Sequence, residues 1–142
     1  FRLEKYLLCV RDFKIRKCIA QFRLSSHNLA IESGRHVKPK LPIEQRLCKL
    51  CNLAEVEDER HHLLVCPRFM DQRVRLLYSI IVIDEKLLEG DINSVFNNIL
   101  ASKEEIIIFN LGVYLKKCVK TRKKYLNTMS IVYYNFTGFT MF

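Results

Sequence analysis

Apolar side chains near the start of the chain repeat at the spacing of an amphipathic helix. Between residues 1 and about 22 they recur every three or four positions, and Arg11, Lys14, Arg16 and Lys17 fall largely between them. Positions three and four apart share one face of a helix, so this pattern predicts one amphipathic helix with a basic face. Residues 23–42 contain several serines, Gly34 and two prolines, and they predict mostly irregular chain.

Pro67 marks the start of the next predicted helix. Proline suits a first helical turn, because the N–H that it lacks would be unpaired there anyway. An apolar stripe then predicts that this helix runs to about residue 81, and its members are Phe69, Met70, Val74, Leu77 and Ile81. Gly90 predicts a turn around residues 88–91, and Asp91 can cap a short helix that continues through residue 99.

The longest predicted helix begins at a capping box formed by Ser102 and Glu105. It is expected to run to about residue 125, with an apolar side made of Ile107, Ile108, Leu111, Tyr114, Leu115 and Cys118. Residues 126–142 change to aromatic and β-branched side chains, and a strand, a hairpin and an unstructured tail all stay open for them. We therefore expect a mainly α domain over residues 1–125, followed by this tail.

Composition agrees with one folded domain and adds a polyanion as a candidate partner. The 142 residues are 49% hydrophobic and 27% charged, which excludes collagen-like and wholly disordered chains. Lys and Arg number 24 against 15 Asp and Glu, a net charge of +9. The excess of basic residues falls in residues 1–50 and 101–142, while residues 51–100 are mildly acidic. Basic ends of this kind are typical of proteins that bind nucleic acid, although a generic solubility charge is the alternative.

Three of the six cysteines form a pattern typical of a zinc site. The sequence reads C-x2-C-x9-H-x4-C through Cys48, Cys51, His61 and Cys66. This spacing can close a tetrahedron around one zinc ion, and the filled fourth position leaves no place for an activated water, so the zinc is expected to be structural. His62 competes with His61 for the third position. The spacing of four residues before the last cysteine favours His61.

The alternative interpretation of these cysteines is a set of buried thiols beside surface histidines. Cys9, Cys18 and Cys118 lie outside the pattern and are expected to act as small buried hydrophobes. Reduced cysteines and a zinc pattern favour an intracellular compartment, either nucleus or cytoplasm. No transmembrane segment is predicted, since the longest apolar run is interrupted by polar residues. A chain that begins at Phe1 is expected to be a piece of a longer protein.

Two sequence elements flank the cysteine pair: IE-x-GR at residues 31–35 and DE-x-H-x4-CP at residues 58–67. With the cysteine pair, they make residues 1–125 resemble the C-terminal zinc-binding region of reverse transcriptases from non-LTR (LINE-type) retrotransposons of animals. It implies a larger parent polymerase in which this region holds template RNA or target DNA, with Cys48, Cys51, His61 and Cys66 as zinc ligands. The chain has no Tyr/Phe-x-Asp-Asp motif and no predicted set of catalytic carboxylates. We expect it not to be an enzyme.

Two functions are predicted, and neither involves a small-molecule substrate or a membrane. The first is a zinc-knuckle module whose basic residues meet the phosphates of RNA or DNA. The second is a structural or protein-docking domain that packs on the polymerase or another partner through the apolar helix around residues 106–119 and the aromatic tail. The candidate phosphate contacts are Arg23, Arg35, Lys38, Lys40, Lys116, Lys117, Lys120, Arg122, Lys123 and Lys124.

Overall fold

The computed structural model of the chain describes residues 3–137, with side chains described within residues 3–132. It confirms a mainly helical fold, and no strand occurs in the described range apart from one isolated antiparallel bridge between Leu47 and Val56. The helices are α1 (Lys5–Cys9), α2 (Phe13–Arg23), α3 (Ala30–Ser33), η1 (Ile43–Gln45), η2 (His61–Val65), η3 (Pro67–Phe69), α4 (Met70–Asp84), η4 (Glu85–Leu88), α5 (Ile92–Ala101) and α6 (Glu105–Thr137).

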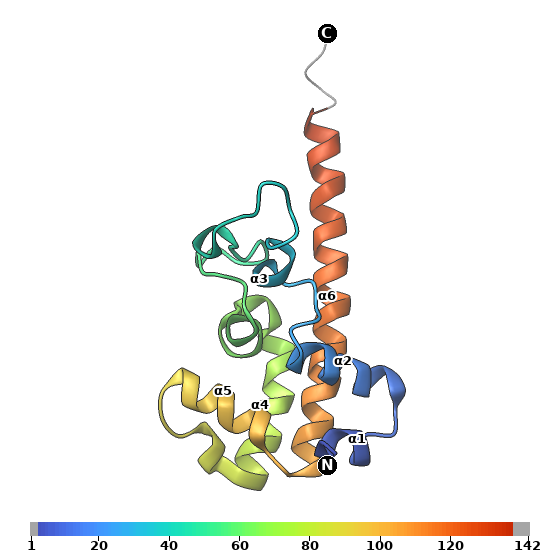
Figure 1. Cartoon of the computed structure of the whole chain (residues 1–142), viewed down its shortest axis with the longest axis vertical. Coiled ribbons are helices and arrows are strands. Elements are labelled where there is room, and N and C mark those ends of the chain that lie inside the picture. Colours follow the sequence, from blue (N-terminus) through green and yellow to red (C-terminus); the bar gives the residue numbers. More distant parts are fainter. Residues whose placement is uncertain (1–2, 138–142) are drawn as a thin grey trace.

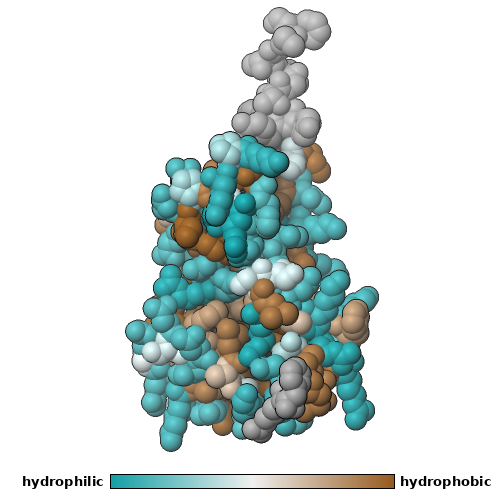
Figure 2. Space-filling view, viewed as in Figure 1, coloured by the Kyte–Doolittle hydropathy of each residue, from teal (hydrophilic) through white to brown (hydrophobic). Residues whose placement is uncertain are grey.

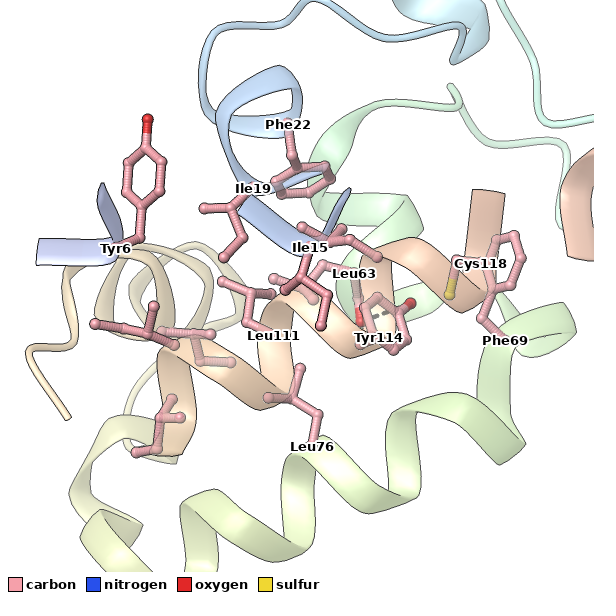
Figure 3. Close-up of a cluster of buried hydrophobic side chains, with 14 of the residues drawn as sticks. Tyr6, Ile15, Ile19, Phe22, Leu63, Phe69, Leu76, Leu111, Tyr114 and Cys118 are labelled. Atoms are coloured by element: carbon pink, nitrogen blue, oxygen red, sulfur yellow. Dashed lines mark hydrogen bonds between the residues drawn. The ribbon is translucent and has the colours of Figure 1, made fainter. Parts of the chain in front are cut away.

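Helix α6 forms the long axis of the molecule, and α2 and α4 pack against its first half (Figure 1). The apolar stripe predicted for this helix is confirmed, since all six of its members are buried. Side chains from α2, α4 and the turns between them converge on this stripe (Figure 3). Tyr114 places its hydroxyl in this core, where it donates to the backbone carbonyl of His62 at 2.6 Å.

The N-terminal segment forms two helices where the sequence predicted one. Val10 has extended backbone and is buried, so the chain leaves α1 there. Asp12 then caps α2, because its carboxylate accepts from the backbone N–H of Ile15 at 3.0 Å. The guanidinium of Arg16 donates to the carbonyl of Val10 at 3.1 Å and stabilises the bend. The periodic pattern did not reveal this break because both helices contribute apolar residues at similar spacing.

The buried face of α4 differs from the predicted one. Met70, Val74 and Ile81 of the predicted stripe are 50%, 58% and 55% exposed, whereas the helix buries Leu76 and Ile80. Arg73 lies on this buried face and donates to the carbonyls of Leu63 and Cys66, both at 2.7 Å. These bonds tie α4 to the turn that precedes it and satisfy the buried guanidinium. The helix therefore turns a charged residue inward and leaves apolar side chains exposed.

The starts of α5 and α6 agree only partly with the caps predicted for them. Asp91 caps α5 as predicted, since it accepts from the N–H of Ser94 at 2.8 Å, and Gly90 has the predicted turn conformation with φ of +95°. Ser102 accepts from the N–H of Glu104 at 3.2 Å, one residue earlier than a capping box with Glu105 requires.

Helix α6 continues to Thr137, so residues 126–137 form neither a strand nor an unstructured tail. Extending an existing helix adds a hydrogen bond for each residue fixed, which outweighs the weak β-propensity of this segment. The hydroxyls of Thr128 and Ser130 also bond the carbonyls four residues earlier, both at 3.0 Å, so these polar groups fit the helix. Residues 138–142 of the predicted tail lie outside the described residues. Within the described range, no helix is both long and apolar enough to cross a bilayer.

Gly112 sits where α2 crosses α6. A Cβ added at this glycine would lie 2.3 Å from Cγ2 of Ile15 and 2.9 Å from Cδ1 of Ile19. We expect Gly112→Ala to lower the free energy of unfolding by roughly 1–3 kcal/mol, because overpacking outweighs the gain in helix propensity. Urea denaturation would measure this loss. Lys117→Ala, at an exposed position of the same helix, should leave stability nearly unchanged, and equal stability of the two variants would contradict the close packing.

Candidate metal centre

The cysteine pair lies at the tip of a short hairpin over residues 46–57. Its two sides are joined by backbone hydrogen bonds from Cys48 N–H to Glu55 carbonyl and from Glu57 N–H to Arg46 carbonyl, both at 2.9 Å. The N–H of Leu50 points back at Cys48 Sγ, 3.4 Å away. This turn directs both sulfur atoms of the C-x2-C pair toward the same point.

The second pair of ligands lies on a widened helical turn, η2. The N–H of Cys66 donates to the carbonyl of His61, five residues earlier, at 2.7 Å. In an α-helix two residues five apart point about 140° away from each other. The wider turn reduces this angle, and the carboxylate of Asp58 fixes its start by accepting from the N–H of His61 at 2.7 Å. Widened turns of this kind are frequent at functional sites.

These two elements bring Cys48, Cys51, His61 and Cys66 into one group that can hold a single metal ion. All four ligand atoms lie within 4.8 Å of one another. The Sγ atoms of Cys48 and Cys66 are 3.9 Å apart, and Cys51 Sγ is 3.5 Å from His61 Nε2. A tetrahedral ion with Zn–S near 2.3 Å and Zn–N near 2.0 Å places such pairs about 3.8 Å and about 3.5 Å apart. These two pairs match that spacing, and the four donors together could hold one metal ion.

Glu55 orients the histidine for this role. One of its carboxylate oxygens lies 3.1 Å from His61 Nδ1, on the side of the ring that faces away from the sulfur atoms. A carboxylate at Nδ1 favours the tautomer that keeps the proton there and leaves Nε2 free to bind a metal. Glu55 was predicted only as a polar loop residue, because the outer hydrogen-bond partner of a metal-binding histidine has no fixed spacing from it in sequence.

Hydrogen bonds within the group shift the pKa values of its members. A hydrogen bond with Cys66, together with burial, raises the pKa of the Cys48 thiol to about 12, and the same hydrogen bond lowers the pKa of Cys66. Hydrogen bonds to Cys48 and Glu55 raise the pKa of His61 to about 9, against the opposing effect of burial. Because a metal binds the deprotonated ligands, it must displace these shared protons.

His62, the other candidate ligand, lies in the core instead. Its ring packs edge-on against Phe69, with ring centroids 4.5 Å apart, and it is only 4% exposed. Burial lowers the pKa of His62 to about 3, so the ring is neutral at pH 7. The structure thus gives the two adjacent histidines different environments, and it places only His61 beside the cysteines.

A buried ion pair next to the hairpin was not predicted. Glu57 is 1% exposed, and its two oxygens each accept from the guanidinium of Arg122 at 2.8 Å. The same carboxylate accepts from the backbone N–H of Ala30 at 2.7 Å. This pair links the hairpin, α3 and α6. Arg122 was a predicted phosphate contact, but its guanidinium pairs with Glu57 inside the protein.

Some of the remaining predicted phosphate contacts have partners within the protein, and others are exposed. Arg23 donates to the carbonyl of Leu100 at 2.6 Å and contacts Glu4 at 3.3 Å, while Arg35 contacts Glu32 at 3.2 Å. Lys116 lies 3.8 Å from Asp12 and is 43% exposed. The other predicted contacts are exposed, and they are Lys38, Lys40, Lys117, Lys120, Lys123 and Lys124.

No protein-family model, curated protein sequence or solved structure matches this chain. The function of this chain therefore has to be inferred from its group of cysteines and histidine and from the distribution of charge on its surface. Hydrophilic side chains cover most of the face shown in Figure 2, with apolar patches between them.

Proposed function

We propose that this chain is a non-catalytic nucleic-acid-binding domain whose loops are held by one structural zinc ion. Three thiolates and one imidazole are the donors that zinc prefers, and they occupy all four positions of a tetrahedron. The resemblance to the C-terminal region of non-LTR retrotransposon reverse transcriptases supports the same proposal. It also supports a parent polypeptide in which this domain holds template RNA or target DNA.

One observation carries the proposal of nucleic-acid binding: the five lysines of α6 share one face of the helix, and all of them except Lys116, which contacts Asp12, are exposed. At about 100° per residue, they fall within an arc of about 120° on the side opposite the buried stripe. Arg122 falls outside this arc, on the side that meets Glu57. A row of cations along a straight helix matches the repeating charge of a phosphate backbone. We name this surface the lysine face, and it comprises Lys116, Lys117, Lys120, Lys123 and Lys124.

The loop over residues 34–42 carries further cations. In the view of Figure 1 it stands at the level of the second half of α6, whose last turns extend beyond it. Arg35, Lys38 and Lys40 are exposed on this loop. Leu41 and Ile31 fix its base, because both of their carbonyls accept from the buried guanidinium of Arg46, at distances from 2.7 to 3.0 Å. The metal hairpin, which carries Arg46, thus positions these cations.

Charge reversal on the lysine face tests the proposal. We expect the double variant Lys117→Glu/Lys124→Glu to bind single-stranded RNA and duplex DNA at least roughly 10-fold more weakly than the unmodified chain. The slope of log affinity against log salt should fall by roughly 1 for each lost phosphate contact. Fluorescence anisotropy over a range of salt concentrations measures both quantities.

The matched control is Lys86→Glu/Lys103→Glu, which makes the same charge change at exposed lysines away from the lysine face. This variant should keep most of the affinity and the same salt slope. Equal weakening by both double variants would mean that net charge alone is responsible. A salt-independent affinity would overturn the proposal and favour protein docking. The apolar side of residues 106–119, predicted as the docking surface, is buried in the core, so the candidate surface is the set of exposed apolar residues of α4, including Val74, Tyr78 and Val82.

A further inference from the structure

A cavity of about 510 Å³ opens beside the lysine face, between α2, residues 26–29 and α6. This volume lies in the range of ordinary ligand sites, roughly 300–1,000 Å³. Its floor is buried and apolar, formed by Phe22, Leu29, Leu115 and the ring of His62. Val119, which is 58% exposed, forms part of its rim.

The rim carries neutral hydrogen-bonding groups and cations. Side-chain amides come from Gln21, Asn28 and Asn127, and none of the lining residues is acidic. His27 also lines the cavity, and its Nδ1 is buried without a hydrogen-bond partner while Nε2 lies 2.9 Å from Glu59. The Nδ1 of His62 is likewise buried and unpaired. A buried polar atom without a partner is costly, so these atoms indicate a polar ligand or bound water.

Lysines flank the opening on two sides. Lys123 belongs both to the cavity wall and to the lysine face, so the two surfaces are continuous on α6. On α2, Lys14 and Lys17 are exposed and stand one helical turn before the lining residues Cys18 and Gln21. A chain of phosphates lying on the lysine face would therefore pass the mouth of the cavity.

We propose that this cavity takes one unstacked base of a single-stranded nucleic acid whose phosphates lie on the lysine face. An apolar floor with aromatic rings favours the face of a base, and amides at the rim can bond its edge. A base paired inside a duplex cannot enter, so the cavity would favour single strands over duplexes. This inference rests on the proposed function and adds a specific site and a strand preference to it.

Filling the cavity from its exposed rim tests the inference. We expect Val119→Phe to weaken binding of a short single-stranded RNA roughly 5- to 100-fold, the range expected for losing one stacked base. Binding of duplex DNA should change little, and the salt slope should stay the same because the lysines remain. The matched control is Val132→Phe, the same substitution at a 49% exposed position of α6 that does not line the cavity.

A second variant and a spectroscopic readout test the cavity without adding a larger side chain. Asn127→Leu removes an amide from the rim with little change of volume, and it should also weaken single-strand binding selectively. A single-stranded RNA that carries 2-aminopurine should change fluorescence on binding to the unmodified chain and not to Val119→Phe. Circular dichroism and zinc content identify any variant that fails to fold.

The results separate this inference from the proposed function. Salt-dependent binding that Val119→Phe and Asn127→Leu leave intact would overturn the base site and keep the lysine face. Equal loss of single-strand and duplex binding in Val119→Phe would also overturn it. An unmodified chain that binds neither RNA nor DNA in a salt-dependent manner would overturn both.

Discussion

The purified chain is expected to contain one zinc ion, and removing it with a strong chelator should abolish much of the helical circular dichroism. In zinc-finger peptides a structural ion contributes about 10–16 kcal/mol, which is comparable with the whole net stability of a domain, about 5–15 kcal/mol. The hairpin and the widened turn that supply the ligands contain only one isolated bridge and one short helix. Such short elements gain little stability from their own backbone hydrogen bonds, so we expect the ion to contribute a large share of it.

The effect should extend beyond the loops that carry the ligands. Arg73 of α4 and Tyr114 of α6 donate to carbonyls of the turn between His61 and Cys66. If this turn unfolds, a buried guanidinium and a buried hydroxyl lose their partners inside the core, at a cost of several kcal/mol. Hydrogen exchange should therefore report faster opening of α4 and the middle of α6, as well as of residues 40–70.

Cys66→Ser tests the same point without a chelator. Cys66 is fully buried at the centre of the group, and we expect the variant to bind no zinc and to melt at a much lower temperature. Cys9→Ser is the matched control, because Cys9 is only partly buried and lies outside the group. It should keep one zinc ion and nearly the original melting temperature. Absence of zinc together with an unchanged spectrum after chelation would show that the cysteines are ordinary core residues.

The features that sequence predicted well are those encoded at short range. The grouping of Cys48, Cys51, His61 and Cys66 was predicted from their spacing, since the C-x2-C turn and the H-x4-C turn each lie within six residues. The buried stripe of α6 was predicted from helical periodicity in the same way. Both patterns depend on residues that are neighbours in the chain, so one sequence is enough to reveal them.

The features that sequence missed depend on partners far apart in the chain. The sequence predicted no role for Arg73, because nothing local shows that the carbonyls of Leu63 and Cys66 lie within reach of its guanidinium. The basic run near the end of α6 looked uniform in sequence, yet helical geometry separates Arg122 from the lysines around it. Glu57 and Arg122 are 65 residues apart, and no spacing rule links them.

The ion pair of Glu57 and Arg122 is expected to contribute strongly to the stability of the fold. We expect Glu57→Gln to lower the free energy of unfolding by about 3–5 kcal/mol, the usual cost of removing one partner of a buried ion pair. The uncharged amide would leave the guanidinium of Arg122 without its counter-charge. To keep the hydrogen bond from the N–H of Ala30, the amide would have to turn its oxygen toward Ala30. Urea denaturation with zinc bound measures the loss.

Glu105→Gln provides the control, because the Lys5–Glu105 pair has a similar distance, 2.9 Å, but is solvent-exposed. Exposed pairs contribute little, so this variant should be nearly as stable as the unmodified chain. Similar stability of the two variants would show that the Glu57 pair is not buried in solution. Arg122 and Leu29 both line the proposed base cavity, and Glu57 holds the segments that carry them. Glu57→Gln should therefore also reduce the affinity for single strands more than the affinity for duplexes. This comparison is made with zinc bound and without denaturant, under conditions where the variant is folded.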